Sequence, residues 1–171
     1  MKNFVVGLLV GALLVIGVAH SGIAQVSAAT GPRVTGIGGV FFKAEDPKAL
    51  AKWYRENLGL EAGYGNTTLF KWRELEQSDV VGSTVWGPFV KTTKYFRKEG
   101  AQWMLNFRVT QLDALLAELR KKGVTVEEKI ESADYGRFAW IYDIEGNRVE
   151  LWEPTATPPP TTPPTNPKEK P

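Results

Sequence analysis

Two groups of side chains in this sequence are candidates for chemistry. The first is Glu150, which lies in the apolar run of residues 149–152. A carboxyl group without a partner in an apolar pocket has a raised pKa and can act as a general acid or base. If Arg137 faces Glu150 instead, the buried ion pair keeps the carboxylate charged. The sequence leaves both arrangements open.

Tyr135 and Arg137 form the second candidate group, within residues 134–138. An Arg guanidinium binds a ligand carboxylate or phosphate through two parallel hydrogen bonds, and a Tyr hydroxyl donates one more. The structural alternative is that Arg137 pairs with Glu150 or Glu131, and that Tyr135 covers the edge of the core. Both interpretations place this segment just before a strand.

Metal chemistry has little support in the sequence. The chain has one His, His20, and no Cys. A bound metal needs several convergent donors, and no Asp/Glu cluster has a recognised calcium-loop spacing. We therefore expect no cofactor.

The two ends of the chain are expected to lie outside the folded domain. Residues 1–30 are typical of an export signal, because Lys2 precedes an uncharged apolar run and then small residues suited to cleavage. The protein is then periplasmic or extracellular, or membrane-anchored if the signal is not cleaved. Residues 154–171 contain eight of the eleven prolines, which predicts a disordered Pro/Thr-rich tail. The tail is either a spacer or an end without a partner.

The remaining residues, 31–153, suit one domain with one core. The formal net charge is +2, and no basic stripe is present, which argues against nucleic acid as a partner. Six Trp and eight Phe supply apolar area for the core.

A repeat organises this domain. Residues 39–50 align with residues 104–115, and residues 83–88 align with 149–154. The repeat divides the domain into modules of about 33–90 and 101–153. In each module, the pattern of apolar residues predicts a strand, a helix and then three strands.

The elements follow from local signals. In the first module, Asp46 and Pro47 start a helix that Gly59 ends. In the second, Thr110 and Asp113 resemble a capping box. The predicted strands cover residues 34–43, 61–64, 68–74, 83–89, 103–109, 124–130, 138–142 and 148–152. Tyr95 is predicted to serve packing only.

This order resembles the glyoxalase/bleomycin resistance/extradiol dioxygenase superfamily, which has the vicinal oxygen chelate (VOC) fold. The segments that carry the resemblance are 36–42 with Asp46-Pro47, 105–109 with Leu112-Asp113, and 143–152, which is close to the family's terminal Asp-Pro-x-Gly-Asn-x-x-Glu-Leu. The resemblance implies an α+β fold, with two tandem βαβββ modules forming curved mixed β-sheets around a concave pocket. Many relatives are dimers, so a homodimer is compatible with it.

The resemblance also implies where a metal would bind in relatives. The corresponding positions here are Gly39, Thr84, Met104 and Glu150. Only Glu150 is a suitable ligand, since a Met thioether suits copper rather than zinc, magnesium or manganese. Metal-dependent isomerisation and ring cleavage are therefore not expected.

The pocket is expected to hold a small organic ligand instead. Alternation along the strands, together with the rim segment, predicts the ligand-binding residues Phe41, Trp86, Met104, Asn106, Tyr135, Arg137 and Trp152. This mixture of aromatic and polar groups is usual for a small-molecule site. The alternative is that Trp86 and Trp152 fill the cavity as core.

Three functions are compatible with these observations. The first is an exported glyoxalase-like domain that binds a small ligand without metal, as bleomycin-binding relatives do. The second is a glyoxalase-like or lyase-type enzyme with Glu150 as catalytic acid/base and Tyr135 or Arg137 stabilising an oxyanion. The third is a structural or interaction module.

Overall fold

The computed structural model describes residues 31–61, 63–75 and 79–155. The predicted export signal lies outside these residues, and so does all of the predicted tail except residues 154 and 155. Within the described residues, no helix is long and apolar enough to cross a membrane.

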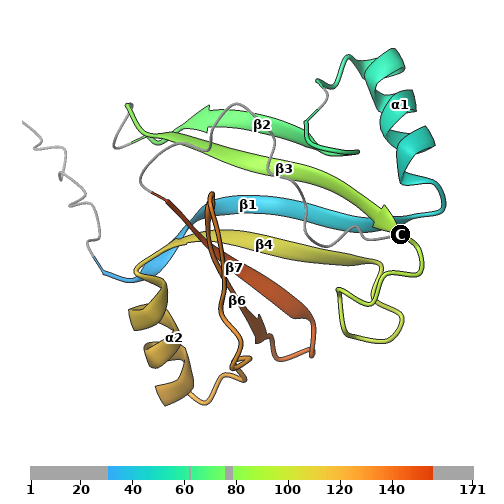
Figure 1. The fold of residues 1–171 in the computed structure, drawn as a ribbon. Coiled ribbons are helices and arrows are strands. Elements are labelled where there is room, and N and C mark those ends of the chain that lie inside the picture. The colour runs from blue at the N-terminus through green and yellow to red at the C-terminus, as the bar shows by residue number, and fades with distance from the viewer. Residues whose placement is uncertain (1–30, 62, 76–78, 156–171) are drawn as a thin grey trace, which may run out of the picture.

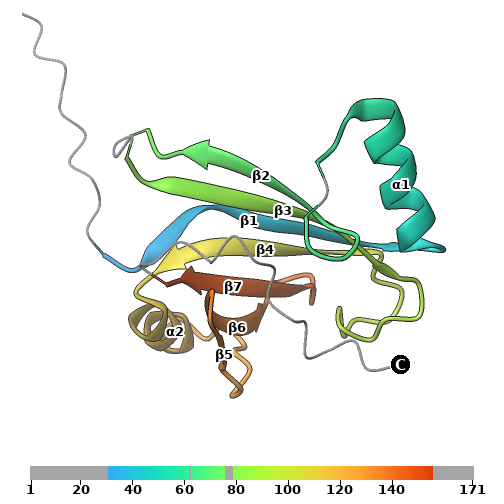
Figure 2. The same ribbon diagram turned by 45° about the horizontal axis from the view of Figure 1, so that its top comes forward.

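Seven strands form one curved, mixed sheet, in the order β2-β3-β1-β4-β7-β6-β5 (Figure 1). The elements are β1 (Arg33–Ala44), α1 (Pro47–Leu58), β2 (Thr68–Arg73), β3 (Val81–Val90), β4 (Trp103–Thr110), α2 (Leu112–Lys121), β5 (Glu131–Ala133), β6 (Gly136–Tyr142) and β7 (Arg148–Pro154). Helices α1 and α2 lie toward opposite ends of the sheet, as Figure 2 also shows. The predicted α+β fold is confirmed, and the sheet is not closed.

The central pair of strands is β1 and β4, which are antiparallel. Strand β3 runs parallel to β1 on one side, and β7 runs parallel to β4 on the other. Strands β2 and β6 then pair antiparallel with β3 and β7. The middle of β7 therefore lies next to β4, deep in the sheet.

Two of the eight predicted strands are wrong. Residues 61, 63 and 64 lie in no strand, because Gly65 has a positive φ of 59° and a turn closes with Gly63 N donating to Thr67 O over 2.8 Å. Residues 124–130 contribute only an isolated bridge between Val126 and Ile141, and the short β5 follows them. The first half of the sheet therefore has three strands instead of four, while the second half has four, with the short β5 in place of the predicted strand 124–130.

The helices begin in two different ways. Helix α1 starts as predicted, with the Asp46 side chain accepting a hydrogen bond from Ala49 N and with Gly59 ending it at φ 67°. The predicted capping box of α2 is wrong, because Gln111 occupies the N-cap without a capping side-chain bond. Glu153 of β7 accepts from Leu112 N instead, at 3.0 Å. A tertiary contact thus replaces the local cap.

The aliphatic core lies between α2 and the second half of the sheet. Its buried members are Val109, Leu112, Leu116, Ala139, Val149 and Leu151. Because side chains alternate along a strand, Val149 and Leu151 point to the α2 face and Glu150 points to the opposite face. This opposite face carries the candidate site.

Candidate functional site

Glu150 is buried in the middle of the sheet, with 3% of its surface exposed. It lies beside Asn106 on β4 and beside Trp140 on β6. Neighbouring positions on paired strands share a face, so all three side chains point the same way. The site is therefore built on three adjacent strands.

Three uncharged donors hold the Glu150 carboxylate. Asn106 Nδ2 donates to Oε1 at 2.7 Å, and Trp140 Nε1 donates to Oε2 at 2.8 Å. The Tyr95 hydroxyl also donates to Oε2. Neither arrangement predicted from the sequence holds, since Glu150 has hydrogen-bond partners and none of these three carries a positive charge.

Tyr95 comes from the loop between β3 and β4, and the sequence analysis missed its role. Its ring stacks on Phe89, with centroids 5.7 Å apart, and meets Trp140 edge-on. Burial, and then the negative charge of Glu150, raise the pKa of Tyr95 far above its usual range. The hydroxyl therefore stays protonated as a donor. No local spacing signals this contact, because it joins a loop to a distant strand.

Arg148 holds this loop in place. Arg148 is buried, with 5% of its surface exposed. Its guanidinium makes two hydrogen bonds to Glu127, at 2.7 and 2.8 Å. A third hydrogen bond, of 2.7 Å, goes to the Tyr95 carbonyl. The guanidinium also lies 4.5 Å from the Trp140 ring centroid. Hydrogen bonds from Arg148 lower the pKa of Glu127, so the pair is charged.

Asn106 is held by a glycine-containing bulge in β1. The register between β1 and β4 shifts between Ile37 and Gly39, which makes Gly38 an extra residue opposite Asn106. A Cβ at Gly38 would lie 2.0 Å from Asn106 Oδ1 and 3.0 Å from the Trp152 ring. Asn106 Oδ1 is buried and has no hydrogen-bond partner among the described residues. A side chain at position 38 is thus incompatible with this site.

Four of the predicted ligand-binding residues gather on the Glu150 face. Besides Asn106, Phe41 packs on Phe89 at 5.4 Å, and Met104 lies across from Phe41 and is fully buried. Trp152 follows Glu150 on the same face and stacks on Phe138 at 6.4 Å. These side chains make the surroundings of Glu150 largely apolar.

Trp86 and Thr84 lie on the other face, contrary to the prediction. Trp86 packs against Phe42 at 5.1 Å and against Tyr54 of α1 at 4.8 Å. The Thr84 hydroxyl donates to the carbonyl of Ile37 at 2.6 Å. The reason is register: Val85 and Gly87 are the residues of β3 that pair with Gly39 and Phe41. An error of one residue moves a side chain to the opposite face.

Tyr135 and Arg137 separate in the structure. Tyr135 is half-buried against Phe138, and burial, followed by the charge of Glu150, raises its pKa. Arg137 instead donates two hydrogen bonds to Asp113 of α2, at 2.8 and 2.7 Å. Tyr135 therefore lies within electrostatic reach of Glu150, whereas the guanidinium of Arg137 is engaged on the α2 side.

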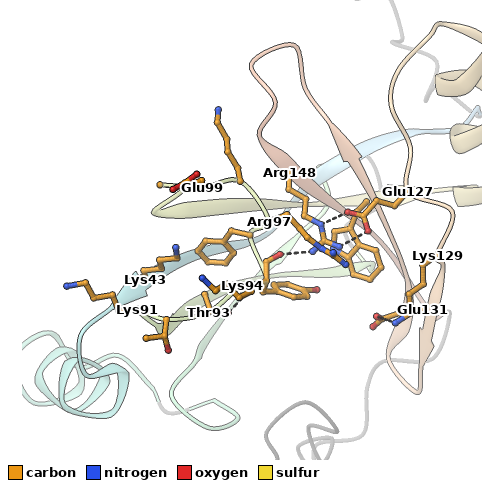
Figure 3. A pocket seen from close by; sticks show the side chains of 16 residues that line it. Lys43, Lys91, Thr93, Lys94, Arg97, Glu99, Glu127, Lys129, Glu131 and Arg148 are labelled. Carbon is orange, nitrogen blue, oxygen red and sulfur yellow. Dashed lines mark hydrogen bonds and ion pairs between the residues drawn. The ribbon is translucent and has the colours of Figure 1, made fainter.

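A cavity of about 690 Å³ opens beside the cluster, next to the loop of residues 91–100 (Figure 3). Tyr95, Trp140 and Arg148 are among its lining residues, and the first two also donate hydrogen bonds to Glu150. Its cationic side chains are Lys43, Lys91, Lys94, Arg97, Lys98, Lys129 and Arg148. The cavity is thus basic, whereas the surroundings of Glu150 are aromatic.

The residues present do not fit the divalent metal of the VOC fold. At the four corresponding positions, Gly39 has no side chain, Thr84 points to the other face and Met104 offers a thioether. The oxygens of Glu150 already accept three hydrogen bonds. Within residues 31–61, 63–75 and 79–155, no group of three His, Cys, Asp or Glu side chains could hold a metal ion.

Comparisons with known proteins agree with this architecture. Residues 39–152 match the family described as Glyoxalase-like domain. Methylmalonyl-CoA epimerase from Streptomyces coelicolor, solved with 2-nitronate-propionyl-CoA, is similar at 20% identity and a TM-score of 0.55, covering 72% of this chain and 100% of that one. The epimerase from Mycobacterium tuberculosis is similar at 24% identity and a TM-score of 0.52, covering 77% and 95%. No curated protein sequence matches the chain. At these identities, the solved structures show a shared fold.

Proposed function

Because this chain belongs to the glyoxalase-like domain family, we propose that it binds a small organic molecule beside Glu150 without a metal ion. The observation that carries this proposal is the buried Glu150 carboxylate, held by uncharged donors among aromatic rings. Small-molecule sites typically combine a largely apolar lining with a few polar groups that fix the orientation of the ligand. Glu150 supplies such a group.

Tyr95 is the donor that a ligand would replace. Asn106 and Trp140 donate from paired strands, whereas Tyr95 donates from a loop. A ligand hydroxyl or amine then takes the place of the phenol on Glu150 Oε2. Its planar part occupies the space beside Phe89 and Trp140 that the Tyr95 ring fills in this structure. The expected ligand is therefore planar, largely apolar and equipped with a hydrogen-bond donor.

The solved relatives support the class of ligand only. Methylmalonyl-CoA epimerases of this fold have been solved in complex with small organic molecules, and a domain of this fold is therefore suited to hold one. Fold does not determine the ligand, so the epimerase ligands are not transferred to this chain.

A thermal-shift screen tests the proposal. Phenols and aromatic amines are compared with hydrocarbons of the same size, on the wild type and on Glu150→Gln. We expect compounds with a donor to raise the melting temperature of the wild type, and we expect Glu150→Gln to remove most of that shift. Treatment with a chelator should change neither result. Glu145→Gln, at an exposed turn, is the matched control.

Two results contradict the proposal. One is an undiminished shift in Glu150→Gln, and the other is a stoichiometric transition metal bound at Glu150 in elemental analysis. If Glu150→Gln does not fold, Tyr95→Phe replaces it. This variant leaves Oε2 without the competing hydroxyl, so donor ligands should bind more tightly, by about tenfold or more, in line with about 1.5 kcal/mol or more for a hydrogen bond to a charged group. An unchanged affinity would also contradict the proposal.

An enzyme is the second candidate function. The observation that favours it is the hydrogen bond from Tyr95 to Glu150, since a paired hydroxyl and carboxylate can exchange a proton with a bound substrate. Arg137 takes no part in this version, because it binds Asp113. Glu150→Gln should then abolish turnover of a ligand found in the screen, while leaving its folding intact. Full turnover in that variant would eliminate the enzyme.

We further propose that residues 1–30 are an export signal and that the domain works outside the cytoplasm. The sequence pattern from Lys2 onward supports this, and residues 22–28 contain the candidate cleavage sites. The mass of the intact protein tests it. A chain that lacks the first 24 to 28 residues, recovered outside the cytoplasm, is expected. A full-length chain that sediments with membranes would instead support an anchor.

We also infer that the domain consists of two modules related by an internal repeat. The matching strand order on the two sides of the β1–β4 pair supports this. A homodimer remains a prediction, which sedimentation velocity of the purified protein would test.

A further inference from the structure

We propose that the basic cavity beside the loop of residues 91–100 binds a small polyanion, a molecule with two or more phosphate or carboxylate groups. This site is distinct from the aromatic surroundings of Glu150 and does not depend on the function proposed above. Tyr95 and Trp140 lie between the two, since both line the cavity and both donate to Glu150.

Charge is the first argument. Seven cationic and three acidic side chains line the cavity, which leaves an excess of four positive charges. The whole chain has a formal net charge of only +2. Charge of one sign that is gathered in a concave, partly desolvated space attracts ligands of the opposite sign. The cavity therefore favours anions more than the protein's overall composition suggests.

The pairing of these charges is the second argument. Glu127 is bound by Arg148, and Glu131 is bound by Lys129 at 2.8 Å. In contrast, Lys94 and Arg97 form no side-chain ion pair with any residue that the structure describes. Two of the acidic groups are thus already neutralised by partners. On the loop, Lys91 is paired with Glu45, whereas Lys94 and Arg97 have no fixed counter-charge among the described residues.

The geometry of the loop is the third argument. Arg97 N donates to the Lys94 carbonyl at 3.0 Å, and Arg97 has a φ of 63°, which is unfavourable for a residue with a side chain. Phe96, between them, is 1% exposed. Lys98 Nζ ties the loop to the turn before β7 through Glu145 O at 2.7 Å. A buried anchor, a hydrogen bond across the turn and the contact from Lys98 thus hold this cationic turn beside the cavity.

Size and distribution favour a polyanion over a single phosphate. A cavity of about 690 Å³ is in the range of small-molecule sites and exceeds what one phosphate would fill. The cations are spread apart, with Lys43 on one side of the group of lining side chains and Lys129 on the other side (Figure 3). A ligand with two separated anionic groups can contact both sides at once.

Isothermal titration calorimetry of the full chain tests this inference. The probes are inorganic pyrophosphate and citrate, which distinguish phosphate from carboxylate chemistry, with inorganic phosphate as the monomeric anion. We expect saturable binding of at least one of the two larger anions, at least tenfold tighter than inorganic phosphate, that weakens as salt is added.

Matched double variants separate a site from general charge attraction. Lys94→Gln/Arg97→Gln removes two charges from the cavity, and Arg120→Gln/Lys121→Gln removes the same two charges from α2. The first should weaken binding about tenfold or more, as for lost charged contacts of about 1.4 kcal/mol in total, and the second should leave it unchanged. Equal loss in both variants, or no saturable binding of either polyanion, overturns the inference.

Polyanion binding can be tested separately from ligand binding beside Glu150. Glu150 is not among the residues that line the cavity, so a folded Glu150→Gln protein should keep its affinity for the polyanion. Binding of aromatic ligands without binding of polyanions would refute this inference alone. The reverse outcome would refute only the proposed function.

Discussion

Tyr95 donates a hydrogen bond to Glu150 across 55 positions of sequence, from a loop to the middle of a buried strand. The loop that joins the two halves of the sheet therefore covers the Glu150 carboxylate on the aromatic face. Arg148 fixes the loop from beneath by binding the Tyr95 carbonyl. A segment that serves as a connection in the chain thus forms part of the site.

Tyr95→Phe should change how stability depends on pH. The pKa of Tyr95 is raised in the folded protein, so the stabilisation from the protonated phenol is complete below its unfolded value of about 10 and is lost as the pH rises above it. Urea unfolding between pH 8 and pH 11 should show a steep fall for the wild type. Tyr95→Phe should show a shallower one, and a parallel decline in both proteins would contradict this.

Arg148→Met should destabilise the fold strongly. It leaves Glu127 without its ion-pair partner in a partly buried position, with only the Tyr142 hydroxyl still donating to it, and it removes the hydrogen bond to the Tyr95 loop. We expect a loss of about 3 kcal/mol in the free energy of unfolding, measured with urea. Lys52→Met breaks an exposed ion pair with Glu56 on α1 and should change it by about 0.5 kcal/mol or less. Similar losses in the two variants would show that burial of the pair has no consequence.

The same pair predicts sensitivity to acid. Because Arg148 lowers the pKa of Glu127, the stabilisation is present above the unfolded value of 4.5 and is lost as the pH falls below it. The wild type should therefore lose stability between pH 5 and pH 3, an interval of about two units around the ordinary Glu pKa. Glu127→Gln should lose less over this interval, as followed by thermal unfolding. An equal slope in that variant would be evidence against the pair as the cause.

Gly38→Ala should disrupt the site. The added Cβ would lie 2.0 Å from Asn106 Oδ1, and the backbone around it is fixed by the bulge. Overpacking of this kind costs about 1 to 3 kcal/mol, which urea unfolding measures. Gly31→Ala, where nothing lies within 4 Å of the new Cβ, is the control. Adding Asn106→Ala to Gly38→Ala should recover part of the cost of Gly38→Ala, because it removes the clashing oxygen.

The start of α2 should depend on a residue from β7. Glu153 accepts from Leu112 N, so Glu153→Ala should cost about 1 kcal/mol, the usual effect of losing an N-cap. Glu153→Gln keeps an acceptor oxygen and should cost less. Chemical denaturation followed by far-ultraviolet circular dichroism measures both. If the two variants are equally stable, Glu153 does not cap the helix.

Local signals predicted most of the elements. Asp46, Pro47 and Gly59 bounded α1 because capping and left-handed termination depend on residues within a few positions of each other. Alternation located β4, since a half-buried strand shows its two faces in its own sequence. The predicted capping box of α2 was wrong because the acceptor for Leu112 N comes from Glu153, 41 residues further along the chain.

The features of the site likewise divide into those that the sequence predicted and those that only the tertiary structure decided. From the sequence alone came the aromatic character of the domain, its resemblance to a family and the position of Glu150, because composition and motifs are properties of the chain. Only the tertiary structure decided that Tyr95 covers Glu150, that Arg137 binds Asp113 and that Trp86 faces α1. These contacts depend on strand register and loop placement, where a shift of one residue reverses the face that a side chain occupies. No local pattern encodes that shift.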